Sequence, residues 1–100
     1  YWKKQPIIKT MNTKEGNKII EQFMLPYDRI DEYRIDQLTY HSNWNELMKV
    51  VIEIEEIGGD DNEFDIFGNC VQLGDEEFVG KTKIEAVWNA VVWWCMEKLD

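Results

Sequence analysis

The chain has 100 residues, which is the size of one ordinary domain and too short for two separate hydrophobic cores. Hydrophobic residues make up 44% of it and aromatic residues 13%, which is enough apolar surface to favour a folded domain over a disordered chain. The formal net charge of -9 disfavours direct binding to nucleic acid or to an anionic membrane, and leaves mimicry of nucleic acid as an open alternative.

The sequence shows no signal for export or for membrane insertion. No apolar run approaches the roughly 18 residues that a membrane-spanning helix needs. Cys70 and Cys95 do not form the dense pattern of a disulfide scaffold, which predicts reduced thiols in a cytoplasmic protein. Residues 1–10 precede Met11, so we interpret them as a natural extension or an expression remnant, and residues 11–100 as a single domain.

A short amphipathic helix is predicted over residues 13–25. Glu15 lies near its positively charged end, and Pro26 follows the point where it stops. Four apolar residues share one side of this helix: Ile19, Ile20, Phe23 and Met24. The alternation of side chains over residues 33–40 is then compatible with an extended strand whose register is open.

A second helix is predicted after Asn43, because its spacing to Glu46 is that of a capping box. The apolar residues of this helix recur at helical intervals: Leu47, Val50, Val51, Ile54 and Ile57. Gly58 and Gly59 are typical of a helix C-terminus and end it.

A β-hairpin is predicted over residues 64–73. The apolar runs 64–67 and 70–73 flank Gly68 and Asn69, two residues that tolerate the positive φ angles of a tight turn. A third extended piece follows around residues 77–79, before Gly80.

The last helix begins after Thr82, with Glu85 three residues further on. Its apolar face consists of Ile84, Val87, Trp88, Val91, Cys95 and Leu99. Trp93 projects roughly opposite this face and is a candidate for exposure; the alternative is a partly covered surface site for Trp93, with Trp94 at the flank of the core. The elements together predict an α+β sandwich of three helices and a small, mostly antiparallel β-sheet.

Three segments carry a resemblance to a known family. They read GNKII with FM at residues 16–20 and 23–24, YHSNW with LM and VV at 40–44, 47–48 and 50–51, and KTKIEAVWNAVV at 81–92. In this order and spacing, the chain resembles small proteins of phages and prophages of Bacteroides-type gut bacteria, called the phage ABA-sandwich domain family. The resemblance implies helices packed with a small sheet and a phage or prophage origin, but no established activity and no functional residues. The chain departs from the family at Lys49, where proline is common, and at Trp93, where a polar residue is usual.

No catalytic or metal-binding constellation is visible. His41 is the only histidine, and we interpret it as part of the turn before the second helix; an alternative pairs it with Cys70 as a thiol nucleophile. The acidic run at residues 53–65 lacks the spacing of a calcium loop, since the sixth position counted from Asp60 or Asp61 is not glycine. We therefore expect no metal and no cofactor.

The strongest functional hypothesis concerns the tryptophans of the last helix. Trp93 and Trp94 are adjacent, so they point about 100 degrees apart and rarely enter one core together. Trp93, with Met96 and Trp88, is the predicted anchor of a homodimer or host-protein interface. This favours a non-enzymatic protein-binding or accessory domain. The alternative is a small-ligand binder or minor enzyme with a pocket near His41 and Trp44, between the sheet and the second helix.

Overall fold

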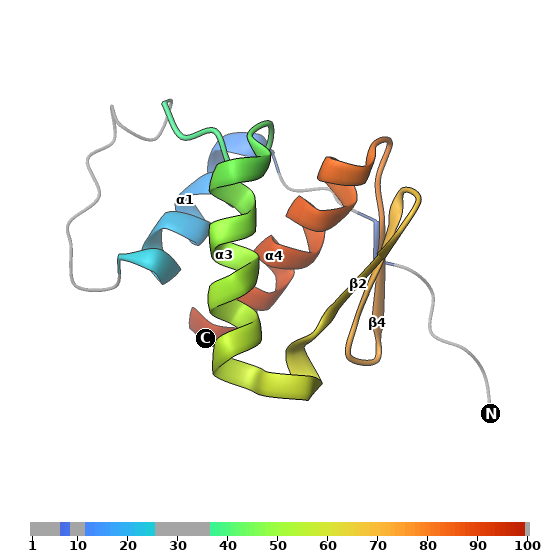
Figure 1. Cartoon of the computed structure of the whole chain (residues 1–100). Helices are drawn as coiled ribbons and strands as arrows, with labels where there is room; N and C mark the ends of the chain where they lie inside the picture. The colour runs from blue at the N-terminus through green and yellow to red at the C-terminus, as the bar shows by residue number, and fades with distance from the viewer. Residues whose placement is uncertain (1–6, 9–11, 26–36, 100) are drawn as a thin grey trace.

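The chain folds in three layers in the computed structural model, which describes residues 7–8, 12–25 and 37–99. Helix α4 (Lys83–Leu99) is the middle layer: α1 (Thr13–Met24) and α3 (Trp44–Gly58) lie on one side of it, and the sheet lies on the other (Figure 1). The predicted α+β architecture is confirmed, because the described residues contain three α-helices and a small sheet whose pairings are mostly antiparallel. None of these helices is long and apolar enough to cross a membrane.

Each of the three helices begins at a polar cap residue. The side-chain oxygens of Asn12, Asn43 and Thr82 accept hydrogen bonds from the backbone N–H three residues further on, at 2.8, 3.3 and 3.2 Å. Such a bond satisfies a donor that has no partner within the helix. The predicted starts at Asn43 and Thr82 are therefore confirmed.

The sheet has the strand order β1-β4-β3-β2. Strands β2 (Phe64–Phe67), β3 (Cys70–Leu73) and β4 (Glu76–Val79) pair antiparallel in chain order, which confirms the predicted hairpin and its third extended piece. Strand β1 (Ile7–Ile8) pairs parallel with β4. Two residues of the segment that sequence analysis left outside the domain thus form part of the sheet.

The first turn of the sheet depends on a glycine. Phe67 lies opposite Cys70, so only Gly68 and Asn69 connect β2 to β3. Gly68 has a φ of 61°, whereas no non-glycine residue among those described has a positive φ. A positive φ at the first turn position alone is the pattern of a type II′ turn, which matches the twist of the flanking strands.

Helix α4 is buried on nearly every side because it lies between two layers. Seven consecutive residues, 86–92, are buried. Toward the sheet, the Trp93 ring lies 5.4 Å from that of Phe78; toward α1, the Trp94 ring meets Phe23 edge-on at 5.1 Å. Trp93 is half-buried and not fully exposed, which agrees with the partly covered site that was the alternative, because the side of α4 opposite the predicted apolar face also has a packing partner.

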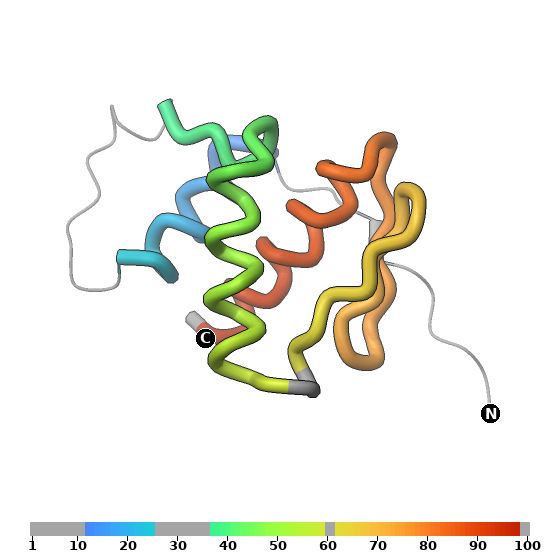
Figure 2. The backbone as a smooth tube through the Cα atoms, viewed as in Figure 1, coloured from blue at the N-terminus to red at the C-terminus, as the bar shows by residue number. Residues whose placement is uncertain are grey.

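Two further predictions need correction. Ile57 was assigned to the apolar stripe of the second helix, but 53% of it is exposed, because it lies in the last turn of α3. From there the chain leaves through the 3₁₀ helix η1 (Gly59–Asn62) and crosses to β2 (Figure 2). The strand expected over residues 33–40 is absent over its described part, residues 37–40, which form a turn and irregular structure; the remainder lies outside the described residues.

Candidate functional site

A buried amide on α1 connects two helices and a turn. Asn17 is 2% exposed, and its Oδ1 accepts a hydrogen bond of 2.9 Å from the indole N–H of Trp88 on α4. Its Nδ2 donates to the carbonyl oxygen of Leu38 at 3.1 Å and lies 2.9 Å from Nδ1 of His41. An indole N–H can only donate, so the orientation of the amide is determined, and Nδ1 of His41 is the acceptor.

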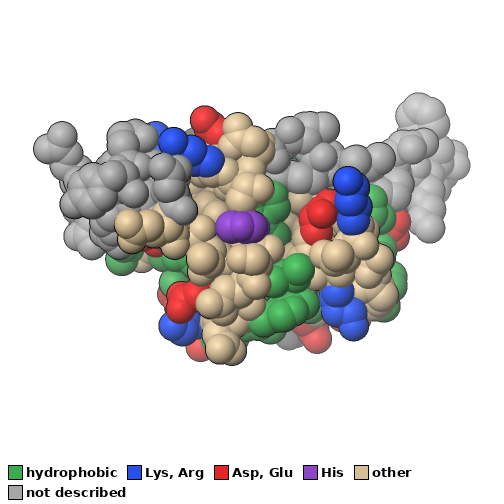
Figure 3. Space-filling model, turned by 90° about the horizontal axis from the view of Figure 1, so that it is seen from above, with side chains coloured by type: hydrophobic (Ala, Val, Ile, Leu, Met, Phe, Trp, Pro, Cys, Tyr) green, Lys and Arg blue, Asp and Glu red, His purple; other side chains and the backbone are tan. Residues whose placement is uncertain are grey.

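This arrangement assigns His41 a structural role within the part of the chain that is described. His41 is exposed, and its side chain is visible at the surface when the molecule is seen from above (Figure 3). Its Nδ1 is engaged by Asn17, which holds the turn over residues 37–43 against α1. The partner of His41 Nδ1 is therefore the Asn17 amide and not the Cys70 thiol of the alternative interpretation.

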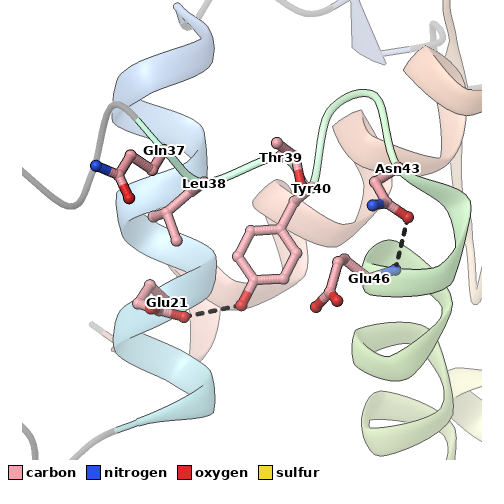
Figure 4. Close-up of a pocket in the computed structure, with 7 residues that line it drawn as sticks. All are labelled: Glu21, Gln37, Leu38, Thr39, Tyr40, Asn43 and Glu46. Carbon is pink, nitrogen blue, oxygen red and sulfur yellow. Dashed lines mark hydrogen bonds between the residues drawn. The ribbon is translucent and has the colours of Figure 1, made fainter.

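A pocket of about 370 Å³ lies between α1, this turn and the start of α3 (Figure 4). We call it the polar pocket, and it is lined by Glu21, Gln37, Leu38, Thr39, Tyr40, Asn43 and Glu46. Glu21 points from α1 toward Tyr40, whose hydroxyl donates a hydrogen bond of 2.8 Å to Glu21 Oε1. Glu46 approaches from α3 on the other side of the tyrosine ring. The pocket therefore presents carboxylates from two helices.

Burial and the neighbouring carboxylates make Tyr40 harder to ionise than an ordinary tyrosine. Burial raises the pKa of Tyr40 well above its ordinary value, and the hydrogen bond to Glu21 and the charges of Glu21 and Glu46 raise it further. Tyrosine is neutral at physiological pH in any case, so the raised pKa extends to higher pH the range over which Tyr40 donates to Glu21. Glu46 Oε1 accepts a hydrogen bond of 3.3 Å from Nζ of Lys49, so this carboxylate already contacts a cation of the chain.

A second hollow, of about 480 Å³, lies between η1, the β3–β4 turn and the last turns of α4. We call it the tryptophan groove, and it is lined by Asn62, Leu73, Gly74, Asp75, Glu76, Trp93, Trp94 and Glu97. Trp94 is 5% exposed, whereas Trp93 is half-buried, and Asp75 and Glu97 are exposed. Aromatic side chains that are packed against the core thus lie next to carboxylates at the surface.

The remaining residues of the predicted interface are placed differently. Met96 is 41% exposed on α4, but it does not line the tryptophan groove. Trp88 is buried, where its indole bonds to Asn17, so it is a core residue and contributes no surface for a partner. Of the three candidates, Trp93 is the one that lines a groove.

The alternative pocket was expected near His41 and Trp44, between the sheet and the second helix. Both residues are exposed, and neither lines the polar pocket. The polar pocket lies between α1 and α3, and not between α3 and the sheet. Several of its lining residues are nevertheless neighbours of His41 in the sequence.

Neither cysteine is exposed in the structure. Burial raises the pKa of the Cys95 thiol to about 12, so at neutral pH it is protonated and unreactive. Cys70 is half-buried in β3. Across residues 7–8, 12–25 and 37–99, no group of three or more histidine, cysteine, aspartate or glutamate side chains is arranged to hold a metal ion.

Sequence reasoning missed the polar residues of α1. Asn17 and Glu21 are four residues apart and flank Ile20, so they lie on the side of the helix that enters the core. The detectable signal was the presence of polar residues within an apolar stripe, next to Gly16 in a helix interior. Each finds its partner more than 18 residues away in the chain, which no local pattern reveals.

Comparison of the chain with models of known protein families, with curated proteins and with solved structures gives no match. The resemblance to phage ABA-sandwich proteins therefore stays a prediction from the sequence. The function is inferred from the geometry of the tryptophan groove and the polar pocket.

Proposed function

We propose that this chain is a non-enzymatic protein-binding or accessory domain, of phage or prophage type, that contacts a host protein through the tryptophan groove. The observation that carries the proposal is the position of Trp93 in the wall of the groove, with its ring held against Phe78. A partly covered, rigid indole offers a partner a large contact area with little loss of side-chain entropy. Tryptophan is over-represented among residues that dominate binding energy for this reason.

The charge of the groove favours a different protein as the partner over a second copy of this chain. In a two-fold symmetric dimer the same patch meets itself, so Asp75 and Glu97 of one copy would approach the same residues of the other. The net charge of -9 on each copy adds to this repulsion. A host protein with complementary charge meets neither obstacle.

The test compares two aromatic residues at different sites. The tagged full chain, Trp93→Leu and Phe67→Leu are used to capture proteins from the lysate of a bacterial host, and the captured protein is then purified and titrated against each variant. Phe67 is the matched control, because it is an exposed aromatic residue on β2 outside the groove. We expect Trp93→Leu to weaken binding by about 30-fold and Phe67→Leu by less than about 2-fold.

Equal weakening by both variants, or by neither, would contradict a contact at the groove. Light scattering of the free protein tests the remaining alternative, which is a homodimer formed through the groove. A dimer that dissociates in Trp93→Leu but not in Phe67→Leu would replace the host protein with a second copy and overturn the charge argument.

A second candidate function is favoured by the polar pocket. The carboxylates of Glu21 and Glu46 and the amide of Asn43 line a space that suits a small amine or guanidine. The test is thermal unfolding with arginine, agmatine or spermidine. A stabilising ligand is expected to raise the melting temperature by about 5 °C at concentrations far above its Kd. Glu46→Gln should abolish the rise and Glu53→Gln, on an exposed part of α3, should not; no rise with any ligand rejects this function.

A further inference from the structure

The tryptophan groove combines two features that recognise the same kind of chemical group. Its aromatic walls are Trp93 and Trp94, and both rings are held in place by other aromatic residues of the core. Asp75 comes from the β3–β4 turn and Glu97 from α4, so carboxylates reach the groove from two separate elements. The face of an indole ring and a carboxylate both attract a cation.

One of the protein's own cations already contacts Trp94. The ammonium nitrogen of Lys98 lies 5.3 Å from the centre of the Trp94 ring, within the range of a cation–π contact. The ring contact of Trp93 is instead with Phe78, through which the indole is anchored to the sheet. The groove that Trp93 lines is also lined by the carboxylates of Asp75, Glu76 and Glu97.

Other chemical classes of partner fit this groove less well. An acidic segment would be repelled by Asp75 and Glu97 and by the net charge of -9. A purely apolar segment would cover these carboxylates without supplying donors, and burying a charge without a partner is costly. A basic segment satisfies the carboxylates and the indole at once.

We propose that the tryptophan groove receives an arginine-bearing segment of the partner protein, with the guanidinium stacked on Trp93 and bonded to Asp75 and Glu97. This inference rests on the proposed function and adds the chemistry of the partner to it. Arginine fits better than lysine, because its planar guanidinium stacks on an aromatic face and offers several N–H donors to carboxylates.

The test uses a short peptide of alternating arginine and serine, and the same peptide with citrulline in place of arginine. Citrulline keeps the shape of the side chain and removes its charge. Both peptides are titrated calorimetrically into the full chain. We expect the citrulline peptide to bind at least ~10-fold more weakly, and the binding of the arginine peptide to weaken as salt is added.

A pair of double variants separates the groove from the charge of the whole protein. Asp75→Asn with Glu97→Gln removes two charges from the groove, and Glu53→Gln with Glu56→Gln removes two from exposed positions of α3. We expect the first pair to weaken the arginine peptide at least ~10-fold and the second less than ~2-fold. All four residues are exposed, so both double variants should have melting temperatures close to that of the wild type.

The outcomes are decisive in either direction. Equal binding of the citrulline peptide, or equal weakening in the two double variants, overturns the inference. The indole N–H signal of Trp93, assigned by its loss in Trp93→Leu, should shift in NMR spectra with the arginine peptide, and its failure to shift would also overturn the inference.

The failure of this inference can be told apart from the failure of the proposed function. If a host protein binds in a Trp93-dependent manner while the arginine peptide does not, the partner chemistry is wrong and the proposed function stands. If the arginine peptide binds but no host protein binds in a Trp93-dependent manner, the proposed function is rejected and the groove remains a cation-binding site.

Discussion

Asn17→Ala is expected to lower the free energy of unfolding by about 3 kcal/mol, because it removes hydrogen bonds to a buried indole and to a partly buried carbonyl on two other segments. The indole N–H of Trp88 loses its acceptor, and the carbonyl of Leu38 loses its donor. The turn that carries His41 loses its connection to α1 at the same time. Denaturant unfolding followed by far-ultraviolet circular dichroism measures the effect.

Asn45→Ala is the matched control for this change. Asn45 is exposed on α3, where alanine is the better helix former, so its replacement should leave stability unchanged or raise it slightly. Trp88→Phe should recover part of the loss when combined with Asn17→Ala, since the donor is then absent. A loss below about 1 kcal/mol for Asn17→Ala would show that water replaces the amide and that the network does not hold the layers together.

Gly16→Ala is expected to lower the free energy of unfolding by about 2 kcal/mol, even though alanine is intrinsically the better helix residue by about 1 kcal/mol. A Cβ at position 16 would overlap Cζ2 and Cη2 of the Trp88 ring and lie 3.2 Å from Cγ2 of Val92. The ring cannot retreat easily, because its N–H is bonded to Asn17. Helix propensity and packing therefore predict opposite signs, and thermal unfolding with a denaturant series decides between them.

A double-mutant cycle identifies the cause of the effect. The phenylalanine ring in Trp88→Phe does not reach as far as the indole, so Gly16→Ala should cost less in that background than in the wild type. A stabilising effect of Gly16→Ala in the wild type would show that α1 moves away from α4 without penalty. An equal cost in both backgrounds would show that the tryptophan is not the obstacle.

Much of the fold was predictable because its signals are local. The cap residues Asn43 and Thr82 act on N–H groups three residues away, and the β-turn depends on the freedom of Gly68 to adopt a positive φ. Each of these interactions spans a few residues, so the pattern that encodes it is continuous in the sequence. The parallel pairing of β1 was not predictable in this way, because its partner β4 lies about 70 residues along the chain.

The candidate site was only partly predictable. Trp93 could be singled out because it projects roughly opposite the apolar face of a strong helix and adjoins Trp94. Its groove could not, since Asp75 reaches it from the β3–β4 turn and Asn62 from η1. The polar pocket depends in the same way on a contact between Glu21 and Tyr40, which lie 19 residues apart. No alternation or helical spacing links such positions.

The sequence by itself determined the class of fold, the starts of three helices and the hairpin, because these follow from the patterns and preferences of near neighbours. Only the tertiary structure decided the position of α4 between two layers. That position buries Trp88, gives Trp93 and Trp94 a partner on either side, and turns Asn17 from an ordinary helix residue into the polar link between α1 and α4. The physical reason is that the burial of a residue depends on which residues surround it in space. The hydrophobic effect acts between such residues whatever their distance along the chain.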